Sequence, residues 1–202
     1  MNYGKYKNLR DAAWQCLIDY NVTELPIKIF KIAEMSGIKV VENSNVNGDN
    51  KLSQQESGKS IIENGEWFII FDETKSRGHC KFTVAHELGH ILLGHKLKNG
   101  KHLRTFDLSK PERETEADMF AARLLAPACV LWGLDLHTPE EISKVCDISL
   151  TAATNRAKRM DVLYKRNKFL VSPLERQVYK NFEIFINQQK ISDELAFNGD
   201  FR

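Results

Sequence analysis

Residues 81–95 read KFTVAHELGHILLGH. Their apolar positions recur at helical spacing, and the pattern stops at Gly94, a residue suited to the C-terminus of a helix. His86 and His90 are four positions apart, so on a helix both imidazoles project from one face and can bind one metal ion. Glu87 is offset by one position. It therefore misses the metal but can reach a water beside it, which is the geometry of a general base.

A third metal ligand is expected downstream, because a catalytic zinc takes three protein ligands and keeps one open position. Residues 114–118, ETEAD, supply three candidate carboxylates. Glu114 and Asp118 share one helix face, whereas Glu116 points about 200° away from Glu114. We expect Glu114 to bind the metal and Asp118 to accept the free ring N–H of one histidine ligand. Glu116 is the alternative ligand. Acidic residues in a first helical turn are also favoured by the helix dipole without any further role.

Three other histidines accompany this motif. His95 directly follows the end of the predicted helix and is a candidate for an extra ligand or an oxyanion donor. A solvated loop histidine is the favoured interpretation at this position, and also at His79 and His102.

The chain before the motif predicts two helices, a strand and a hairpin. Apolar residues recur at helical spacing in residues 5–20 and again after Pro26, and the strand IKVVE follows Gly37. Residues 43–60 are polar and rich in turn-forming residues, so they predict a loop. Beyond them, Asn64-Gly65 lies between Ile61-Ile62 and the segment WFIIF (residues 67–71), which predicts a β-hairpin.

The chain after the motif predicts helices. Residues 95–110 are basic and irregular, and Pro111 then introduces a helix that stops at Pro127. A capped short helix after Thr138 and another after Ser149 are separated by a turn of about three residues, which predicts a helix-turn-helix-like unit. Another helix is predicted for residues 172–190.

The composition is that of a globular protein, with 42% hydrophobic and 28% charged residues. The net charge of +2 gives no global electrostatic argument for a nucleic-acid or membrane partner. The sequence lacks a signal peptide and an apolar run of bilayer length, so a cytoplasmic location without membrane association is expected. The cysteines form no CxxC pair and are expected to be reduced and mostly buried; they are Cys16, Cys80, Cys129 and Cys146.

Residues 156–168, RAKRMDVLYKRNK, are a basic segment at the end of the second helix of the predicted helix-turn-helix-like unit. DNA binding by this segment is conceivable. A solvated basic face on a region that packs or recognises a protein is favoured, because the total charge is near neutral. The basic residues are Arg156, Lys158, Arg159, Lys165, Arg166 and Lys168.

The stretches KFTVAHELGHILLGH and ETEADMFAARLLAP together resemble the ImmA/IrrE family of metallopeptidases, over roughly residues 25–128. The resemblance implies a compact gluzincin-like domain with His86, His90 and Glu114 as zinc ligands and Glu87 as the base. Members of this family commonly accompany helix-turn-helix repressors in mobile elements or stress-response systems, and relieve repression by cleaving them. One departure is Ala126, where family members often have Met.

These observations predict a mainly helical α+β fold. A small zincin-like metallopeptidase domain with a short β-sheet (residues 1–128) would precede a helical C-terminal region (residues 129–202), whose helix-turn-helix-like unit spans about residues 138–160. The expected activity is Zn2+-dependent hydrolysis of a peptide bond in a regulatory protein, a helix-turn-helix transcriptional repressor. WFIIF is predicted to be an edge strand that holds an extended substrate by strand addition.

The alternative function is a DNA-binding or protein-binding regulator with a structural or vestigial metal site. Glu87 favours catalysis, because a structural site needs no base beside a metal-bound water.

Overall fold

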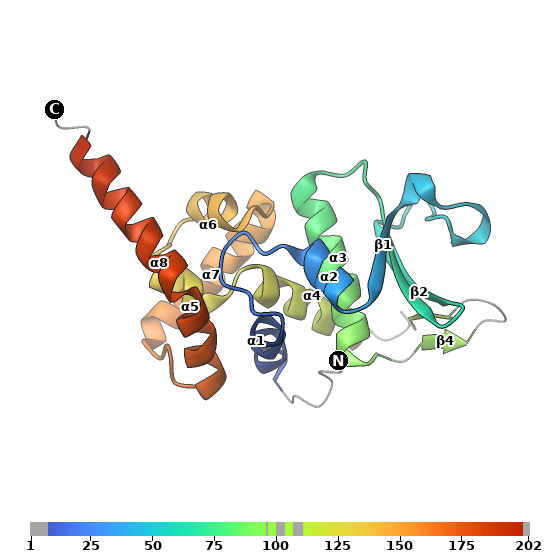
Figure 1. Ribbon diagram of the computed structural model, residues 1–202, viewed down its shortest axis with the longest axis horizontal. Helices are drawn as coiled ribbons and strands as arrows, with labels where there is room; N and C mark the ends of the chain where they lie inside the picture. The colour runs from blue at the N-terminus through green and yellow to red at the C-terminus, as the bar shows by residue number, and fades with distance from the viewer. Residues whose placement is uncertain (1–7, 96, 100–103, 107–110, 200–202) are drawn as a thin grey trace.

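The computed structural model describes residues 8–95, 97–99, 104–106 and 111–199 (Figure 1). Its helices are α1 (Leu9–Asp19), α2 (Ile29–Met35), α3 (Arg77–Leu93), α4 (Pro111–Leu125), α5 (Ala128–Gly133), α6 (Pro139–Cys146), α7 (Leu150–Arg166) and α8 (Pro173–Gly199). Its strands are β1 (Ile38–Glu42), β2 (Gly58–Glu63), β3 (Glu66–Phe71), β4 (Leu97–Asn99) and β5 (Arg104–Phe106). The prediction of a mainly helical α+β fold is confirmed.

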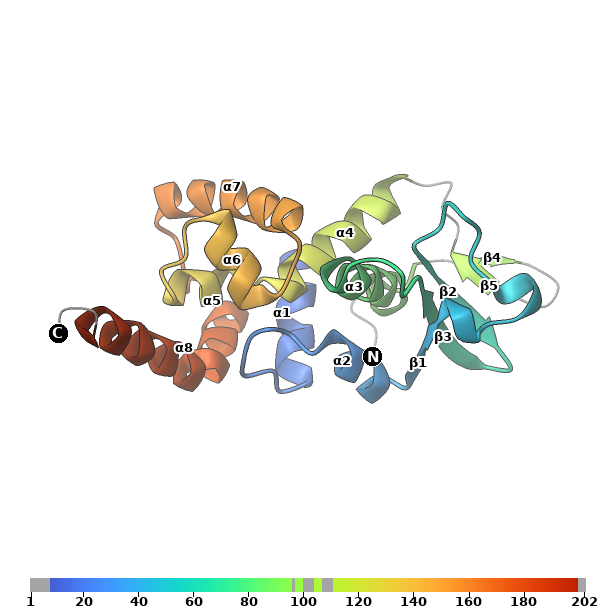
Figure 2. The same ribbon diagram turned by 90° about the horizontal axis from the view of Figure 1, so that it is seen from above.

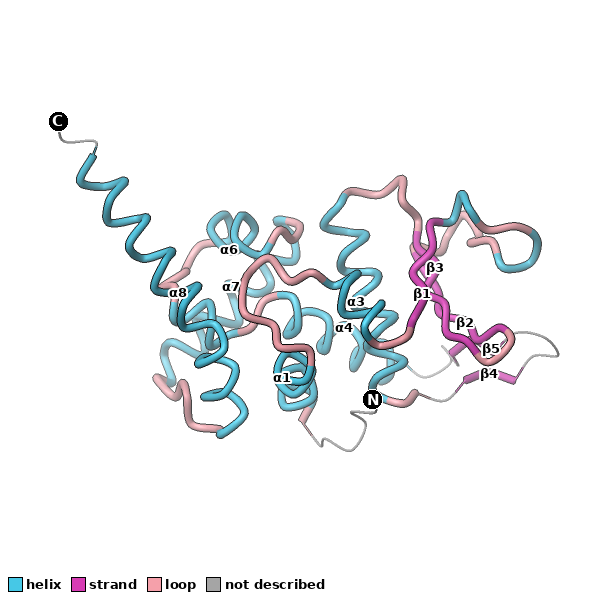
Figure 3. The backbone as a smooth tube through the Cα atoms, viewed as in Figure 1, coloured by secondary structure: helices cyan, strands magenta, loops and turns pink. Residues whose placement is uncertain are grey.

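The sheet and the C-terminal helices lie at opposite ends of the molecule, with α3 and α4 between them (Figures 1 and 2). The strand order is β1-β3-β2-β5-β4, and the strands gather on one side of the helices (Figure 3). Strand β1 runs parallel to β3, and the other pairings are antiparallel. The sheet is therefore mixed, and both α2 and α3 pack against it.

The predicted hairpin is present as β2 and β3. Asn64 and Gly65 both have positive φ, 51° and 84°, as a tight two-residue hairpin turn requires. Strand β2 begins at Gly58, three residues earlier than the apolar pattern indicated, because Gly58 to Ser60 pair with Phe71 to Ile69 of β3. The end of the predicted loop is thus part of the sheet.

The prediction that WFIIF forms an edge strand is wrong. Strand β3 lies between β1 and β2, and β1 pairs with all five residues of WFIIF, from Ile38↔Trp67 to Glu42↔Phe71. Ile69 and Ile70 are both buried although they point to opposite faces of the sheet. A continuous apolar run is typical of an interior strand with both faces covered. Both sides of β3 are already paired, so a substrate strand cannot add to it.

The helix that carries the HELGH motif ends as predicted, at Gly94, whose φ of 72° is left-handed. Gly89 lies where α3 crosses α4. A Cβ atom at Gly89 would lie 3.1 Å from Phe120 Cδ1 and 3.4 Å from Ala117 Cα, so a larger side chain would force the helices apart. The close crossing brings the first turn of α4 to the histidines of α3.

Two helices and a turn also occur at the predicted helix-turn-helix-like unit. Thr138 caps α6 with a capping box, Ser149 caps α7, and Asp147 between them is left-handed with φ of 52°. Helix α7 continues to Arg166, beyond the predicted end of the unit near residue 160. The turn is joined to α3 by the buried Lys81, whose Nζ lies 3.1 Å from Asp147 Oδ2.

The described residues share one buried hydrophobic cluster that includes side chains from α1 to α8. The cluster continues across residue 128, and the division at that residue stays a prediction. All four cysteines are free and buried, as predicted. No helix within the described part of the chain combines the length and apolar character needed to cross a membrane.

Candidate metal centre

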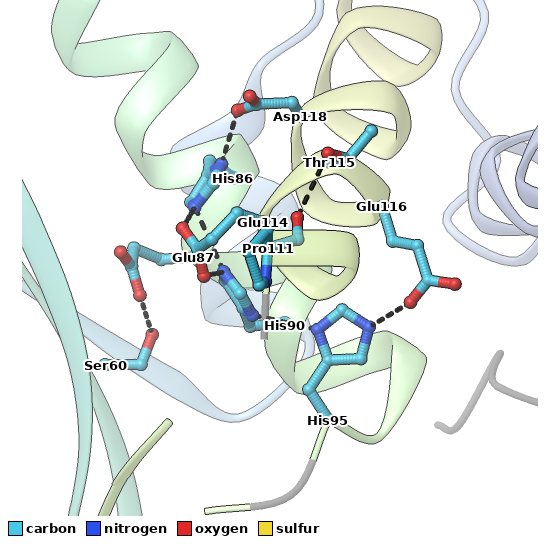
Figure 4. A network of polar contacts seen from close by, with 10 residues as sticks. All are labelled: Ser60, His86, Glu87, His90, His95, Pro111, Glu114, Thr115, Glu116 and Asp118. Atoms are coloured by element: carbon cyan, nitrogen blue, oxygen red, sulfur yellow. Dashed lines mark hydrogen bonds and ion pairs between the residues drawn. The ribbon is translucent and has the colours of Figure 1, made fainter. Parts of the chain in front are cut away.

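His86 and His90 face the first turn of α4 from the middle of α3 (Figure 4). Their Nε2 atoms are 3.0 Å apart, and the rings meet edge to face at 4.7 Å between centroids. His90 is buried, and burial is the main cause that lowers its pKa to about 3, with His86 and His95 adding to the effect. His90 is therefore neutral at pH 7, the form in which imidazole binds a metal ion.

Glu114 brings a carboxylate to the same two nitrogen atoms. Its Oε2 lies 3.4 Å from His86 Nε2, and its Oε1 lies 3.2 Å from His90 Nε2. Oε1 is buried and has no hydrogen-bond partner among the described residues. One ligand atom from each residue lies within 4.8 Å of the other two. Two imidazoles and one carboxylate form a donor set that suits zinc, so these residues fit a zinc ion.

Asp118 lies where the sequence predicted it, one turn along α4 from Glu114. Its Oδ1 is 2.8 Å from His86 Nδ1 (Figure 4). An ionised carboxylate can only accept a hydrogen bond, so this contact requires the proton on Nδ1 and leaves a lone pair on Nε2. Asp118 thereby holds His86 in the tautomer that can bind a metal ion through Nε2.

Glu116, the alternative ligand, points to His95 instead. Glu116 Oε2 is 3.1 Å from His95 Nε2, and His95 Nδ1 is 2.8 Å from His90 Nδ1. If Glu116 accepts from His95 Nε2–H, then His95 Nδ1 must accept from His90 Nδ1–H. The lone pair of His90 is then on Nε2, toward Glu114. In this arrangement Glu116 and His95 hold His90 in the tautomer that can bind a metal ion through Nε2, as Asp118 does for His86.

The expectation that His95 is a solvated loop histidine is wrong. Its side chain is only 7% exposed. The left-handed conformation of Gly94 turns the chain back, so that the backbone N–H of His95 donates to His90 O at 3.1 Å. The signal in the sequence was the position of His95 immediately after a helix-ending glycine. His79 is exposed and is not one of the three converging residues, and His102 lies outside the described residues.

Glu87 faces the sheet side of α3 and is buried. Burial raises the pKa of its carboxyl group, and a hydrogen bond from Ser60 opposes this rise. Ser60 Oγ donates to Glu87 Oε2 at 2.7 Å from strand β2 (Figure 4). Sequence reasoning missed Ser60, because it is 27 positions from Glu87 in a segment predicted to be a loop, and no local pattern marks it.

A comparison with known protein families gives a match that covers the candidate metal centre. The family described as the IrrE N-terminal-like domain matches residues 33–158. That range includes every residue of the candidate centre and extends past residue 128 into α7. No curated protein matches the chain.

Proposed function

Because the chain belongs to the ImmA/IrrE metallopeptidase family, we propose that it is a zinc-dependent endopeptidase that cleaves a regulatory protein. The observation that carries the proposal is the convergence of His86, His90 and Glu114, with the carboxylate of Glu87 on the next position of the same helix. A family that hydrolyses peptide bonds implies a protein substrate. The two imidazoles and Glu114 would hold the metal ion.

A zinc ion held there would supply a Lewis acid that polarises the scissile carbonyl group and acidifies a water. The residues of the chain perform the proton transfers. Glu87 accepts the proton of the attacking water and later gives it to the leaving amine. A raised pKa suits both steps, because the carboxyl group must be able to hold the proton between them. The hydrogen bond from Ser60 keeps one carboxylate oxygen in place during the transfer.

The proposed substrate is a helix-turn-helix transcriptional repressor. Support comes from the resemblance of the two helical motifs to the ImmA/IrrE family, whose members commonly act on such repressors. Cleavage would relieve repression. The scissile bond is a matter for experiment, and candidate repressors can be incubated with the zinc-loaded protein and their fragments identified by mass spectrometry.

The first test is the zinc content of the purified protein and two variants. We expect about one zinc per chain in the wild type and in Glu87→Gln, and none in His86→Ala, because Glu87 is adjacent to a ligand without being one. Glu87→Gln should then lose peptide hydrolysis while it keeps the metal. Absence of zinc from the wild type after reconstitution would contradict the proposal. So would full hydrolytic activity in Glu87→Gln.

A DNA-binding regulator with a structural metal site is the second candidate. Its support is the pair of helices α6 and α7 together with exposed basic side chains at Lys158, Lys165 and Arg166. Binding to duplex DNA, measured by fluorescence anisotropy over a series of salt concentrations, tests this candidate. Affinity that falls steeply with salt and is reduced by Lys165→Gln would favour it.

A further inference from the structure

A cavity of about 730 Å³ lies beside the metal centre, between the first half of α3, the second half of α4, and the beginning of α7. Figure 2 shows α7 and α4 as neighbouring helices on the same side of the molecule. We call this cavity the arginine pocket, because Arg123, Arg156 and Arg159 line it. Its volume is that of a typical site for a small ligand or a side chain with its neighbours.

The positive charges of the arginine pocket are not balanced. Asp118 is the one acidic residue among the described residues that line it, and Asp118 is already in contact with His86. The first turn of α7 also borders the pocket and contains no acidic residue. The helix dipole therefore adds positive potential at this end of α7. An anion would meet favourable electrostatics on two walls.

Arg156 gives the strongest indication that the pocket binds a negatively charged group. Its Nε atom is buried and has no hydrogen-bond partner among the described residues. Burial lowers its pKa to about 10, and the charges of Arg123 and Arg159 contribute to this lowering. A buried guanidinium N–H without an acceptor is costly. A bound carboxylate would remove that cost, because Arg matches a carboxylate with two parallel hydrogen bonds.

The pocket has an apolar wall and shares Asp118 with the candidate metal centre. Phe82, Leu125 and Ile148 form part of this wall. The ring centroids of Phe82 and His86 are 6.5 Å apart. Asp118 lines the pocket and also contacts His86. A peptide chain at the metal centre can therefore place a nearby side chain in the pocket.

We infer that the arginine pocket is a specificity subsite that binds an acidic side chain of the polypeptide substrate, with an adjoining apolar residue against Phe82 and Leu125. This assignment rests on the proposed peptidase function. A peptide is favoured over duplex DNA because the guanidinium groups line a concave cavity, and Arg156 is half-buried within it. A duplex is too wide to enter a cavity of this size.

The first experiment measures binding without catalysis. Octanoyl-glutamate α-amide carries one side-chain carboxylate, and octanoyl-glutamine α-amide is its uncharged isostere. Isothermal titration of the full chain should show at least tenfold tighter binding of the glutamate probe. Arg156→Gln and the exposed Arg159→Gln should each remove this preference. Lys158→Gln, which loses the same charge on the same helix outside the pocket, should keep it.

Equal binding of the two probes, or an unchanged preference in both arginine variants, would overturn the subsite. Failure of the glutamate probe to bind would also overturn it. Loss of affinity for duplex DNA in the arginine variants, without any binding of the glutamate probe, would assign these arginines to DNA instead. This experiment does not use the reaction, so its result is independent of whether the chain is a peptidase.

The second experiment identifies the source of the acid. A peptide library is cleaved with the zinc-loaded protein, and the products are sequenced by mass spectrometry. We expect Glu or Asp to be enriched at one fixed distance from the cleaved bond in the wild type and in Lys158→Gln, and not in Arg159→Gln. Cleavage without acidic enrichment would contradict the substrate assignment and indicate a free acid as the ligand. Probe binding with no cleavage of any peptide would contradict the peptidase function instead, and the substrate assignment with it.

Discussion

Two glutamates that are two positions apart on one helix have different roles at the scale of single residues. Glu114 faces the Nε2 atoms of His86 and His90, whereas Glu116 faces His95. The helical rotation of about 100° per residue separates them. Both carboxylates still act on the same centre, because His95 returns to His90 after the end of α3.

Replacement of these two glutamates should affect zinc differently. Glu114→Gln removes a proposed ligand, so zinc should be lost at micromolar free metal. Glu116→Gln removes the charge of the acceptor behind His95 but keeps an amide oxygen there, and zinc affinity should fall about tenfold. Competition with a chelating dye measures both dissociation constants. Equal losses in the two variants, or a greater loss in Glu116→Gln, would contradict the assignment of Glu114.

Ser60→Ala should reduce hydrolysis without reducing zinc affinity. The variant removes a hydrogen bond to a buried carboxylate, and such bonds contribute about 1.5–3 kcal/mol. We expect peptide hydrolysis to fall at least about tenfold, since about 1.4 kcal/mol corresponds to a factor of ten. Ser53→Ala, at an exposed loop position, is the control. Loss of zinc together with activity would show that Ser60 supports the fold of the site rather than Glu87.

Contacts between elements depend on small residues at the scale of helices and strands. Gly89 allows α3 and α4 to cross closely, and Gly58 lets β2 approach α3, where a Cβ atom would lie 2.3 Å from Thr83 Cγ2. The first contact brings Glu114 to the histidines, and the second brings Ser60 to Glu87. The site is therefore assembled by the close packing of α4 and of β2 against α3.

A graded series at Gly89 tests the first approach. Gly89→Ala requires only a small shift of Phe120, whereas Gly89→Val should force α4 away and lower the free energy of unfolding by about 2 kcal/mol or more. Zinc affinity should fall in the same order, since Glu114 moves with α4. Urea denaturation and zinc titration measure the two effects. Wild-type stability in Gly89→Val would show that the helices do not need the close crossing.

At the scale of the whole molecule, the described residues form one connected core. Helix α1 packs against both α4 and α8, and the buried cluster joins the metal-centre helices to α5–α8. The salt bridge of the buried Lys81 with Asp147 adds a polar link between α3 and the turn before α7. A chain with one such core is expected to unfold as one unit.

We therefore predict a single unfolding transition for the metal-free protein. In calorimetry, the measured unfolding enthalpy should equal the enthalpy derived from the shape of the transition. A fragment that ends at residue 128 should not unfold cooperatively, because it would expose the buried Leu124 and Leu125. Two separate transitions, or a cooperatively folded fragment of residues 1–128, would instead favour two independent regions.

The sequence by itself determined the helices that carry the candidate ligands and the β2–β3 hairpin, but not β4, β5 or α5. The spacing of His86 and His90, the glycine that ends α3, and the Asn64-Gly65 turn are local patterns, and local backbone preferences are sufficient to read them. The shared face of Glu114 and Asp118 also follows from helical geometry alone. For these reasons the α+β fold and the grouping of the candidate metal ligands were predictable.

Only the tertiary structure decided which partners these elements meet. Three features of the site and the sheet depend on segments that are far apart in the chain. They are the hydrogen bond between Ser60 and Glu87, the contact of the buried His95 with Glu116, and the interior position of β3. The arginine pocket likewise exists only where α7 lies beside α3 and α4. Periodicity tells which face of a helix or strand is buried but not what covers it, because that depends on how all the elements pack together.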